Sequence, residues 1–135
     1  MIDKEIIKIA SNTENHGVLN NHTHFSRLKN SICGDEIKVY LIIQDNKILD
    51  FKYECESCIY CQASVSLLSK NAKNKSIEKV KKFTEQAINI FEKNLQSFDK
   101  ELNEFNKIIK KNNISRKECV LLPFKTVAKA LNYKL

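Results

Sequence analysis

Three cysteines stand far apart in the chain, at positions that a fold can bring together. Cys33 opens a Cys-Gly-Asp turn, Cys58 follows an alternating apolar stretch, and Cys119 precedes a second apolar run. Thiolates are soft ligands that suit zinc, copper(I) and iron–sulfur clusters, and one carboxylate beside three thiolates completes a four-coordinate site. Convergence of these residues would make the chain a protein that handles metal or sulfur.

Two of these cysteines are expected near helix N-termini. Cys58 lies where a strand gives way to a helix, and Cys119 falls in the first turns of a helix whose start is indicated by a capping box of Ser115 and Glu118. The free amide groups and the dipole of a helix N-terminus stabilise negative charge. We therefore expect both positions to lower the pKa of the thiol.

Two further cysteines complicate this pattern. Cys55 and Cys61 form a Cys-x2-Cys-x2-Cys sequence with Cys58, a spacing that can bind a cluster as in ferredoxins, although no fourth Cys-Pro follows. The simpler interpretation is that Cys55 is a core residue at a strand end and Cys61 a helix residue one turn from Cys58. The pair His22 and His24 stands in a polar stretch, where solvated histidines are more common than ligands.

The elements that must position these residues change period along the chain. Residues 3–11 favour a short helix, and residues 25–28 a strand. Apolar residues then alternate over 37–43, and β-favouring residues resume over 48–54, with turn-forming residues at 45–47. This pattern predicts an antiparallel hairpin with Cys33 just before it and Cys58 just after it.

From about residue 60 the chain is predicted to be helical. A break is expected at 71–75, a new helix from Ser76, and Pro123 is expected to kink or restart the last helix. An apolar stripe repeats at alternating steps of three and four residues, and we expect it to pack against this domain rather than form a coiled coil. It comprises Ile88, Phe91, Leu95, Phe98, Leu102, Phe105 and Ile109. The fold class is α+β, with a small antiparallel sheet of about three strands followed by and packed against several α-helices.

Composition sets the remaining limits. The 135 residues suit a single domain, and an apolar fraction of 42% can form a core at that length without a metal. The net charge is +7, but the lysines are scattered among acidic residues and no arginine cluster exists, so no nucleic-acid partner is expected.

No apolar run approaches the length of a membrane span, and the N-terminus has no apolar signal-peptide core. We expect no membrane association and a cytoplasmic protein whose five cysteines stay reduced.

Several motifs follow one another in an order that resembles a known family. The order resembles the iron–sulfur cluster assembly scaffolds of the IscU/NifU N-terminal type, from about residue 12 to the C-terminus. The motifs are Asn15-His16-Gly17-Val18-Leu19, Cys33-Gly34-Asp35, Phe51-Lys52-Tyr53-Glu54, Cys58 followed by Ala63-Ser64 and Ser66, and Arg116-Lys117-Glu118-Cys119. The long interval between Cys58 and Cys119, with a helical insertion at about 76–112, makes the chain most similar to the SufU-like branch, as does Arg116.

The resemblance implies roles for particular residues. Cys33, Asp35, Cys58 and Cys119 would hold zinc or a labile [2Fe–2S] cluster, with Cys119 taking persulfide sulfur from a cysteine desulfurase. Downstream iron–sulfur acceptor proteins would be further partners. Such a protein is a scaffold or sulfur acceptor rather than a stand-alone enzyme. Residues 1–135 would form one domain, acting as a monomer or weak homodimer.

Two other classes of function remain open from the sequence. One is a small redox protein that uses Cys55, Cys58 and Cys61. The other is a structural zinc domain that presents its basic helical surface to a partner. A degenerate paralogue without an active site is a third, less favoured alternative.

Overall fold

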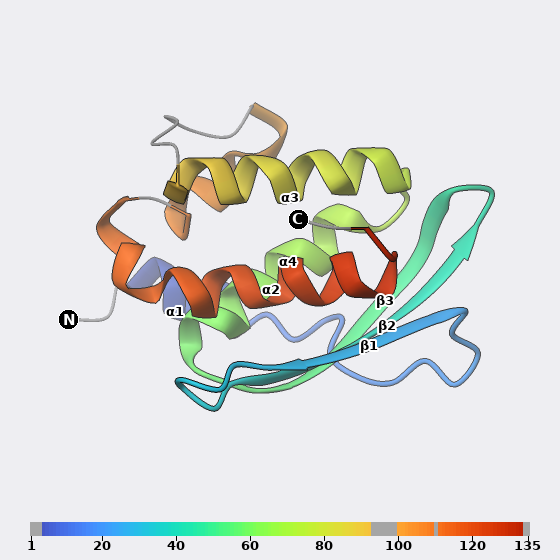
Figure 1. Cartoon of the computed structure of the whole chain (residues 1–135), viewed down its shortest axis with the longest axis horizontal. Coiled ribbons are helices and arrows are strands. Elements are labelled where there is room, and N and C mark those ends of the chain that lie inside the picture. Colours follow the sequence, from blue (N-terminus) through green and yellow to red (C-terminus); the bar gives the residue numbers. More distant parts are fainter. Residues whose placement is uncertain (1–3, 93–99, 110, 134–135) are drawn as a thin grey trace.

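The computed structural model describes residues 4–92, 100–109 and 111–133, with three strands between an N-terminal helix and a mostly helical second half (Figure 1). The elements are α1 (Lys4–Ala10), β1 (His24–Lys29), β2 (Glu36–Gln44), β3 (Lys47–Glu56), α2 (Ile59–Ala72), α3 (Ile77–Glu92), the 3₁₀ helices η1 (Lys100–Lys107) and η2 (Lys111–Arg116), and α4 (Lys117–Ala130). This arrangement confirms the α+β class and the three-stranded antiparallel sheet. No helix in the described part of the chain is long and apolar enough to cross a bilayer.

The sheet has the order β1-β2-β3, and both pairs are antiparallel. The turn between β2 and β3 places Asp45 at φ 52° and Asn46 at φ 61°, the left-handed pair that a two-residue hairpin turn of type I′ requires. Asparagine and aspartate tolerate this conformation better than other non-glycine residues. The hairpin predicted from the alternating pattern is therefore confirmed, with a register shift between Ile42 and Ile43.

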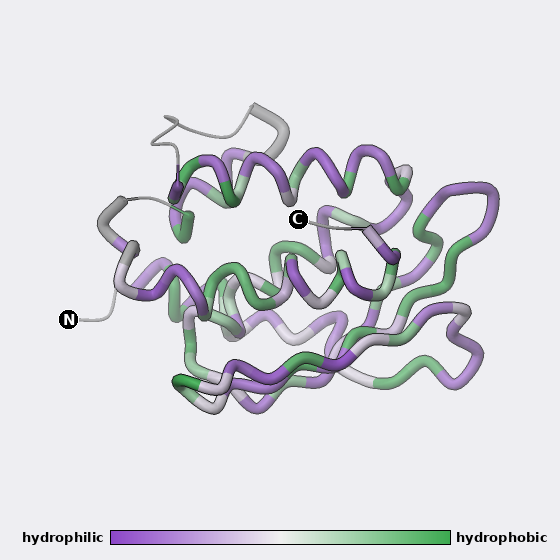
Figure 2. The backbone as a smooth tube through the Cα atoms, in the orientation of Figure 1, coloured by the Kyte–Doolittle hydropathy of each residue, from purple (hydrophilic) through white to green (hydrophobic). Residues whose placement is uncertain are grey.

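One face of the sheet carries the apolar residues, and the helices cover that face (Figure 1). On β2 the fully buried residues are Ile37, Val39 and Leu41, which pair across the sheet with Cys55, Tyr53 and Phe51. Helix α4 packs on β1 and β2, α2 packs on β3, and α3 lies against α4. Hydrophilic residues predominate along α3, and hydrophobic ones recur along α2 and α4 beneath it (Figure 2).

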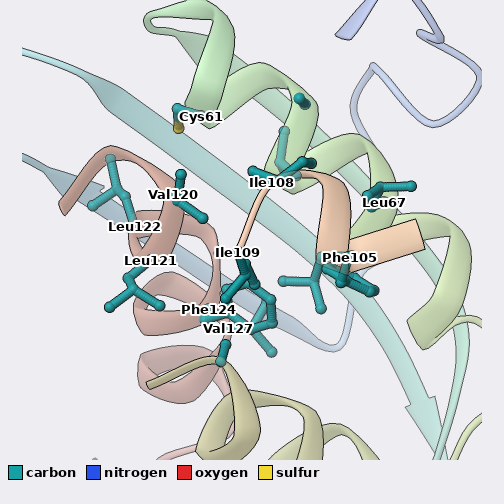
Figure 3. Close-up of a cluster of buried hydrophobic side chains, with 14 of the residues drawn as sticks. Cys61, Leu67, Phe105, Ile108, Ile109, Val120, Leu121, Leu122, Phe124 and Val127 are labelled. Atoms are coloured by element: carbon teal, nitrogen blue, oxygen red, sulfur yellow. The ribbon is translucent and has the colours of Figure 1, made fainter. Parts of the chain in front are cut away.

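The second half of the chain contributes its apolar stripe to this same core. Phe105 and Ile109 are fully buried, and the Phe105 ring lies 5.8 Å from that of Phe124 on α4 (Figure 3). The stripe therefore packs within the chain, as predicted, where its side chains are described; Leu95 and Phe98, and the side chain of Leu102, lie outside that description. The two parts of the stripe belong to separate elements, because α3 ends at Glu92 and Phe105 lies in η1.

The start of α4 differs from the prediction. The N-cap residue is Arg116 rather than Ser115, and no side chain caps the helix with a hydrogen bond, so the predicted capping box is wrong. The chain enters α4 through the 3₁₀ turns of η2, which places Ser115 before the cap position. Pro123 lies inside α4 and does not start a new helix. Because proline has no N–H, it cannot donate the usual helical hydrogen bond to the carbonyl of Cys119.

Candidate metal centre

The hairpin brings Asp35 and Cys58 together at one end of the sheet. Glu36 at the start of β2 pairs with Glu56 at the end of β3, so the residues just outside these two positions lie side by side. The Cys58 N–H donates a hydrogen bond of 3.0 Å to Oδ1 of Asp35. Cys58 is also the N-cap residue of α2, so the sequence-based placement of this cysteine at a helix N-terminus is confirmed.

The loop that carries Cys33 is organised by Asn30. Its side-chain oxygen accepts the Ile32 N–H at 2.9 Å, its carbonyl accepts the Gly34 N–H at 2.8 Å, and its own N–H donates to the Asp35 carbonyl at 2.7 Å. Gly34 has φ 79°, a conformation that glycine adopts without steric cost. This explains the glycine of the Cys-Gly-Asp motif and leaves Cys33 exposed at the surface.

Helix α4 supplies the third cysteine from the far end of the chain. Cys119 is the third residue of α4, and the next residue is tied to α2, because Ser64 donates a buried hydrogen bond of 2.6 Å to the Val120 carbonyl. This contact holds the first turn of α4 against α2. The Sγ atoms of Cys33 and Cys119 are 3.8 Å apart, although the two residues are separated by most of the sequence.

Three of the four predicted ligands form one cluster. The ligand atoms of Cys33, Asp35 and Cys119 all lie within 4.8 Å of one another, and this is the one such group among the residues that the structure describes. Oδ2 of Asp35 is buried without a hydrogen-bond partner. Two thiols and an unpartnered carboxylate oxygen are a donor set that fits zinc or an iron–sulfur cluster. Cys58 is not one of the three, but it lies close enough to Cys119 to affect that thiol's pKa.

The pKa of the Cys119 thiol is raised, contrary to the expectation from its place in the helix. Burial is the main cause, and the neighbouring Cys58 and then Cys33 add to it. Cys119 is only 6% exposed, so loss of water outweighs the favourable helix N-terminus. A positive ion at this cluster would reverse the balance, because a metal-coordinated thiol is deprotonated.

The remaining candidate ligands do not join the cluster. Cys61 is fully buried in the core on α2 (Figure 3), and Cys55 is half-buried near the end of β3, as the simpler interpretation predicted. Together with Cys58 they form no group of ligand atoms in the described part of the chain. His22 contacts the Leu19 carbonyl through Nδ1, and His24 Nδ1 lies 2.8 Å from the Thr23 hydroxyl.

Sequence reasoning missed Asn30 and Ser64. Asn30 precedes the Cys-Gly-Asp motif, and the tendency of asparagine to accept hydrogen bonds from nearby backbone is the signal that could have identified it. The sequence marks Ser64 only as part of a motif, and its hydrogen bond to the Val120 carbonyl depends on a helix pairing that local patterns do not reveal.

Comparisons with known proteins give a consistent result. Residues 1–110 match the family described as the NifU-like N-terminal domain. The chain is 30% identical over 131 residues to a protein of Thermotoga maritima named iron–sulfur cluster assembly scaffold protein IscU, which covers 97% of this chain and 92% of that protein. It is 34% identical over 67 residues to the zinc-dependent sulfurtransferase SufU of Bacillus subtilis, covering 50% of this chain and 45% of the relative.

A solved structure shares the whole architecture. The N-terminal part of a nitrogen-fixing NifU-like protein from Brucella abortus superimposes with a TM-score of 0.89 at 23% identity, covering 96% of this chain and 91% of that one. This likeness shows that the two chains have the same fold.

Proposed function

Because the chain belongs to the NifU-like N-terminal domain family, we propose that it is a scaffold protein for iron–sulfur cluster assembly. The cluster of Cys33, Asp35 and Cys119 is the observation that carries the proposal. Cys58, the N-cap residue beside Asp35, is proposed as the fourth ligand.

Within this function, we assign sulfur acceptance from a cysteine desulfurase to Cys119. Its thiol is in contact with that of the exposed Cys33, so sulfur delivered there arrives among the other ligands. When bound, zinc supplies the charge that keeps the thiols deprotonated. Asp35 is a harder ligand than a thiolate for such a metal, which suits a site that must both hold and release its cargo. The partial similarity to the zinc-dependent sulfurtransferase SufU of Bacillus subtilis supports sulfur acceptance at a site that also binds zinc.

Metal analysis of the protein purified without oxygen tests the proposal. We expect either colourless protein with zinc bound or red-brown protein with a cluster, and loss of the bound species in Cys33→Ala and in Cys119→Ala. Cys55→Ala is the matched control, because Cys55 is a half-buried thiol outside the cluster, and it should retain the metal. Unchanged metal content in both ligand variants would contradict the proposal.

Incubation with a cysteine desulfurase tests the acceptor role separately. Persulfide should form on Cys119, as measured by mass spectrometry of peptides, and be absent from Cys119→Ser. Transfer to Cys55 or Cys61 instead would favour the alternative of a small redox protein.

Three wider features belong to the same proposal. The five free thiols suit a reducing compartment, so we place the protein in the cytoplasm, where desulfurases and downstream acceptor proteins would be its partners. One core draws residues from every layer of the fold, which supports a single domain over residues 1–135. A monomer or weak homodimer stays a prediction.

A further inference from the structure

The contact between Cys33 and Cys119 permits a reaction that metal binding does not need. Both thiols are free, and their Sγ atoms are 3.8 Å apart, which is van der Waals contact for two sulfur atoms. A disulfide needs an S–S distance of about 2.05 Å. Rotation of the Cys33 side chain, which lies on an exposed turn, would bring the two sulfur atoms to that distance. We propose that, in the metal-free protein, Cys33 releases the sulfur carried by Cys119 as hydrosulfide. This inference rests on the proposed acceptance of persulfide by Cys119.

The proposed step balances without an external reductant. The Cys33 thiol gives its proton to water, and its thiolate attacks Sγ of the Cys119 persulfide. The bond between Sγ of Cys119 and the terminal sulfur breaks as the bond between the two Sγ atoms forms. The terminal sulfur leaves with the electron pair as hydrosulfide and is thereby reduced, the Cys33 sulfur is oxidised, and the two cysteines end as one disulfide. A dithiol reductant must then reopen that disulfide before a second turnover.

The structure favours Cys33 over the other cysteines as the attacking thiol. Cys33 is exposed, its Sγ atom lies 3.8 Å from that of Cys119, and it lies on a turn that contains Gly34. Cys58 is half-buried at the N-cap of α2, where its backbone is bonded to Asp35. Cys61 is fully buried within α2, and Cys55 is outside the cluster of ligand atoms.

Sulfur release would also explain why the thiols of Cys33 and Cys119 are in direct contact. Bound metal would hold the Cys33 thiolate and block the attack, so Cys119 would keep its sulfur when metal is present, and the pair would release it as sulfide when metal is absent. The site would thus supply sulfide at the place where the cluster ligands gather.

A single-turnover experiment tests this step. A cysteine desulfurase is loaded with persulfide, freed of L-cysteine by gel filtration, and mixed with the chelator-treated protein in buffer without thiols. We expect hydrosulfide in proportion to the protein, and a tryptic peptide pair linked through Cys33 and Cys119. Cys33→Ser should keep the persulfide on Cys119 and lose the sulfide release. Cys55→Ser, which leaves the cluster intact, should release sulfide as the wild type does, and zinc-loaded wild type should not.

The outcomes separate the two proposals. Absence of persulfide from Cys119 in the zinc-loaded wild type would overturn the proposed acceptor function itself. Its absence only from the chelator-treated wild type and Cys33→Ser, with no sulfide released, would overturn the release step alone. A persulfide that forms on wild-type Cys119 and stays there would overturn the release step alone. A link from Cys58 to Cys119, with normal release by Cys33→Ser, would likewise overturn the assignment to Cys33.

Discussion

The two carboxylate oxygens of Asp35 have different surroundings. Oδ1 accepts a hydrogen bond from the Cys58 N–H, which fixes the start of α2. Oδ2 is buried without a hydrogen-bond partner, and it is the oxygen available to bind a metal. An amide side chain keeps an oxygen that can accept the hydrogen bond but lacks the negative charge of the carboxylate. Substitutions at this one residue can therefore separate its structural role from the metal-binding role proposed for it.

We expect Asp35→Asn to weaken zinc binding and to lower the free energy of unfolding of the metal-free protein less than Asp35→Ala does, because the amide oxygen can still accept the Cys58 N–H. Asp35→Ala should weaken zinc binding and also lower the free energy of unfolding by about 1–3 kcal/mol, because the Cys58 N–H loses its acceptor. Competition with a chromophoric chelator and urea unfolding measure the two effects. Asp45→Asn, an exposed turn substitution, is the control. Equal stability of the two Asp35 variants would contradict the structural role of Oδ1.

Cys61 makes the free energy of unfolding depend on pH in the alkaline range. Burial raises the pKa of this thiol above its ordinary value of 9.0, so the folded state keeps a proton that the unfolded state loses. The stabilisation is complete below about pH 9 and decreases as the pH rises towards the folded-state pKa, by up to about 1.4 kcal/mol per pH unit for one group.

We therefore expect wild-type stability to fall more steeply than that of Cys61→Ala between about pH 9 and about pH 10, by roughly 1 kcal/mol. Urea unfolding of metal-free protein with a reductant measures this difference. Leu67→Ala, another buried truncation on α2, has no titrating group at the site and should keep the wild-type slope. A slope in Cys61→Ala as steep as in the wild type would exclude Cys61 as the cause.

At the scale of elements, sequence patterns predicted correctly those features that depend only on neighbouring residues. The period of two and the Asp45-Asn46 turn predicted the hairpin, because alternation and left-handed tolerance act within a few residues. The capping box at Ser115 failed, because the 3₁₀ turns before α4 shift the cap to Arg116. The capping pattern cannot reveal which residue precedes the first full turn.

The hairpin turn gives a direct test of this element. Asn46→Gly should leave the free energy of unfolding unchanged or raise it slightly, whereas Asn46→Val should lower it by about 1–2 kcal/mol, because a branched side chain opposes the positive φ. Thermal and urea unfolding measure both. Lys47→Val, one residue further on and in β3, is the matched control and should cost much less than Asn46→Val. Similar losses in the two valine variants would argue against a strained turn.

At the scale of the whole molecule, residue types indicated the members of the site but not their geometry. The resemblance grouped Cys33, Asp35, Cys58 and Cys119, and the structure brings three of them within one cluster. The raised pKa of Cys119 was not foreseen, because it depends on how tightly α4 packs beside the sheet. Burial is a property of the assembled layers and has no local signature in the sequence.

The same core predicts the response to metal removal. Because buried residues from the sheet, α2, α3 and α4 form one cluster, chelated protein should stay folded, with its far-ultraviolet circular dichroism unchanged. Saturating zinc should raise the unfolding free energy by about 2.7 kcal/mol at a hundred times the dissociation constant. Cys119→Ala should lose this increase, while Cys55→Ala should keep it. Unfolding on chelation would show instead that the metal is structural.

Pro123 has a consequence for the timing of events at Cys119. The first turn of α4 is joined to the second by one hydrogen bond fewer than in an ordinary helix, since Pro123 cannot donate to the Cys119 carbonyl. Amides of Leu121 and Leu122 should then exchange with deuterium faster than those of Val127 and Ala128, although all four residues are buried. The segment that contains Cys119 would then open and close on its own, while the rest of the helix stays docked on the sheet.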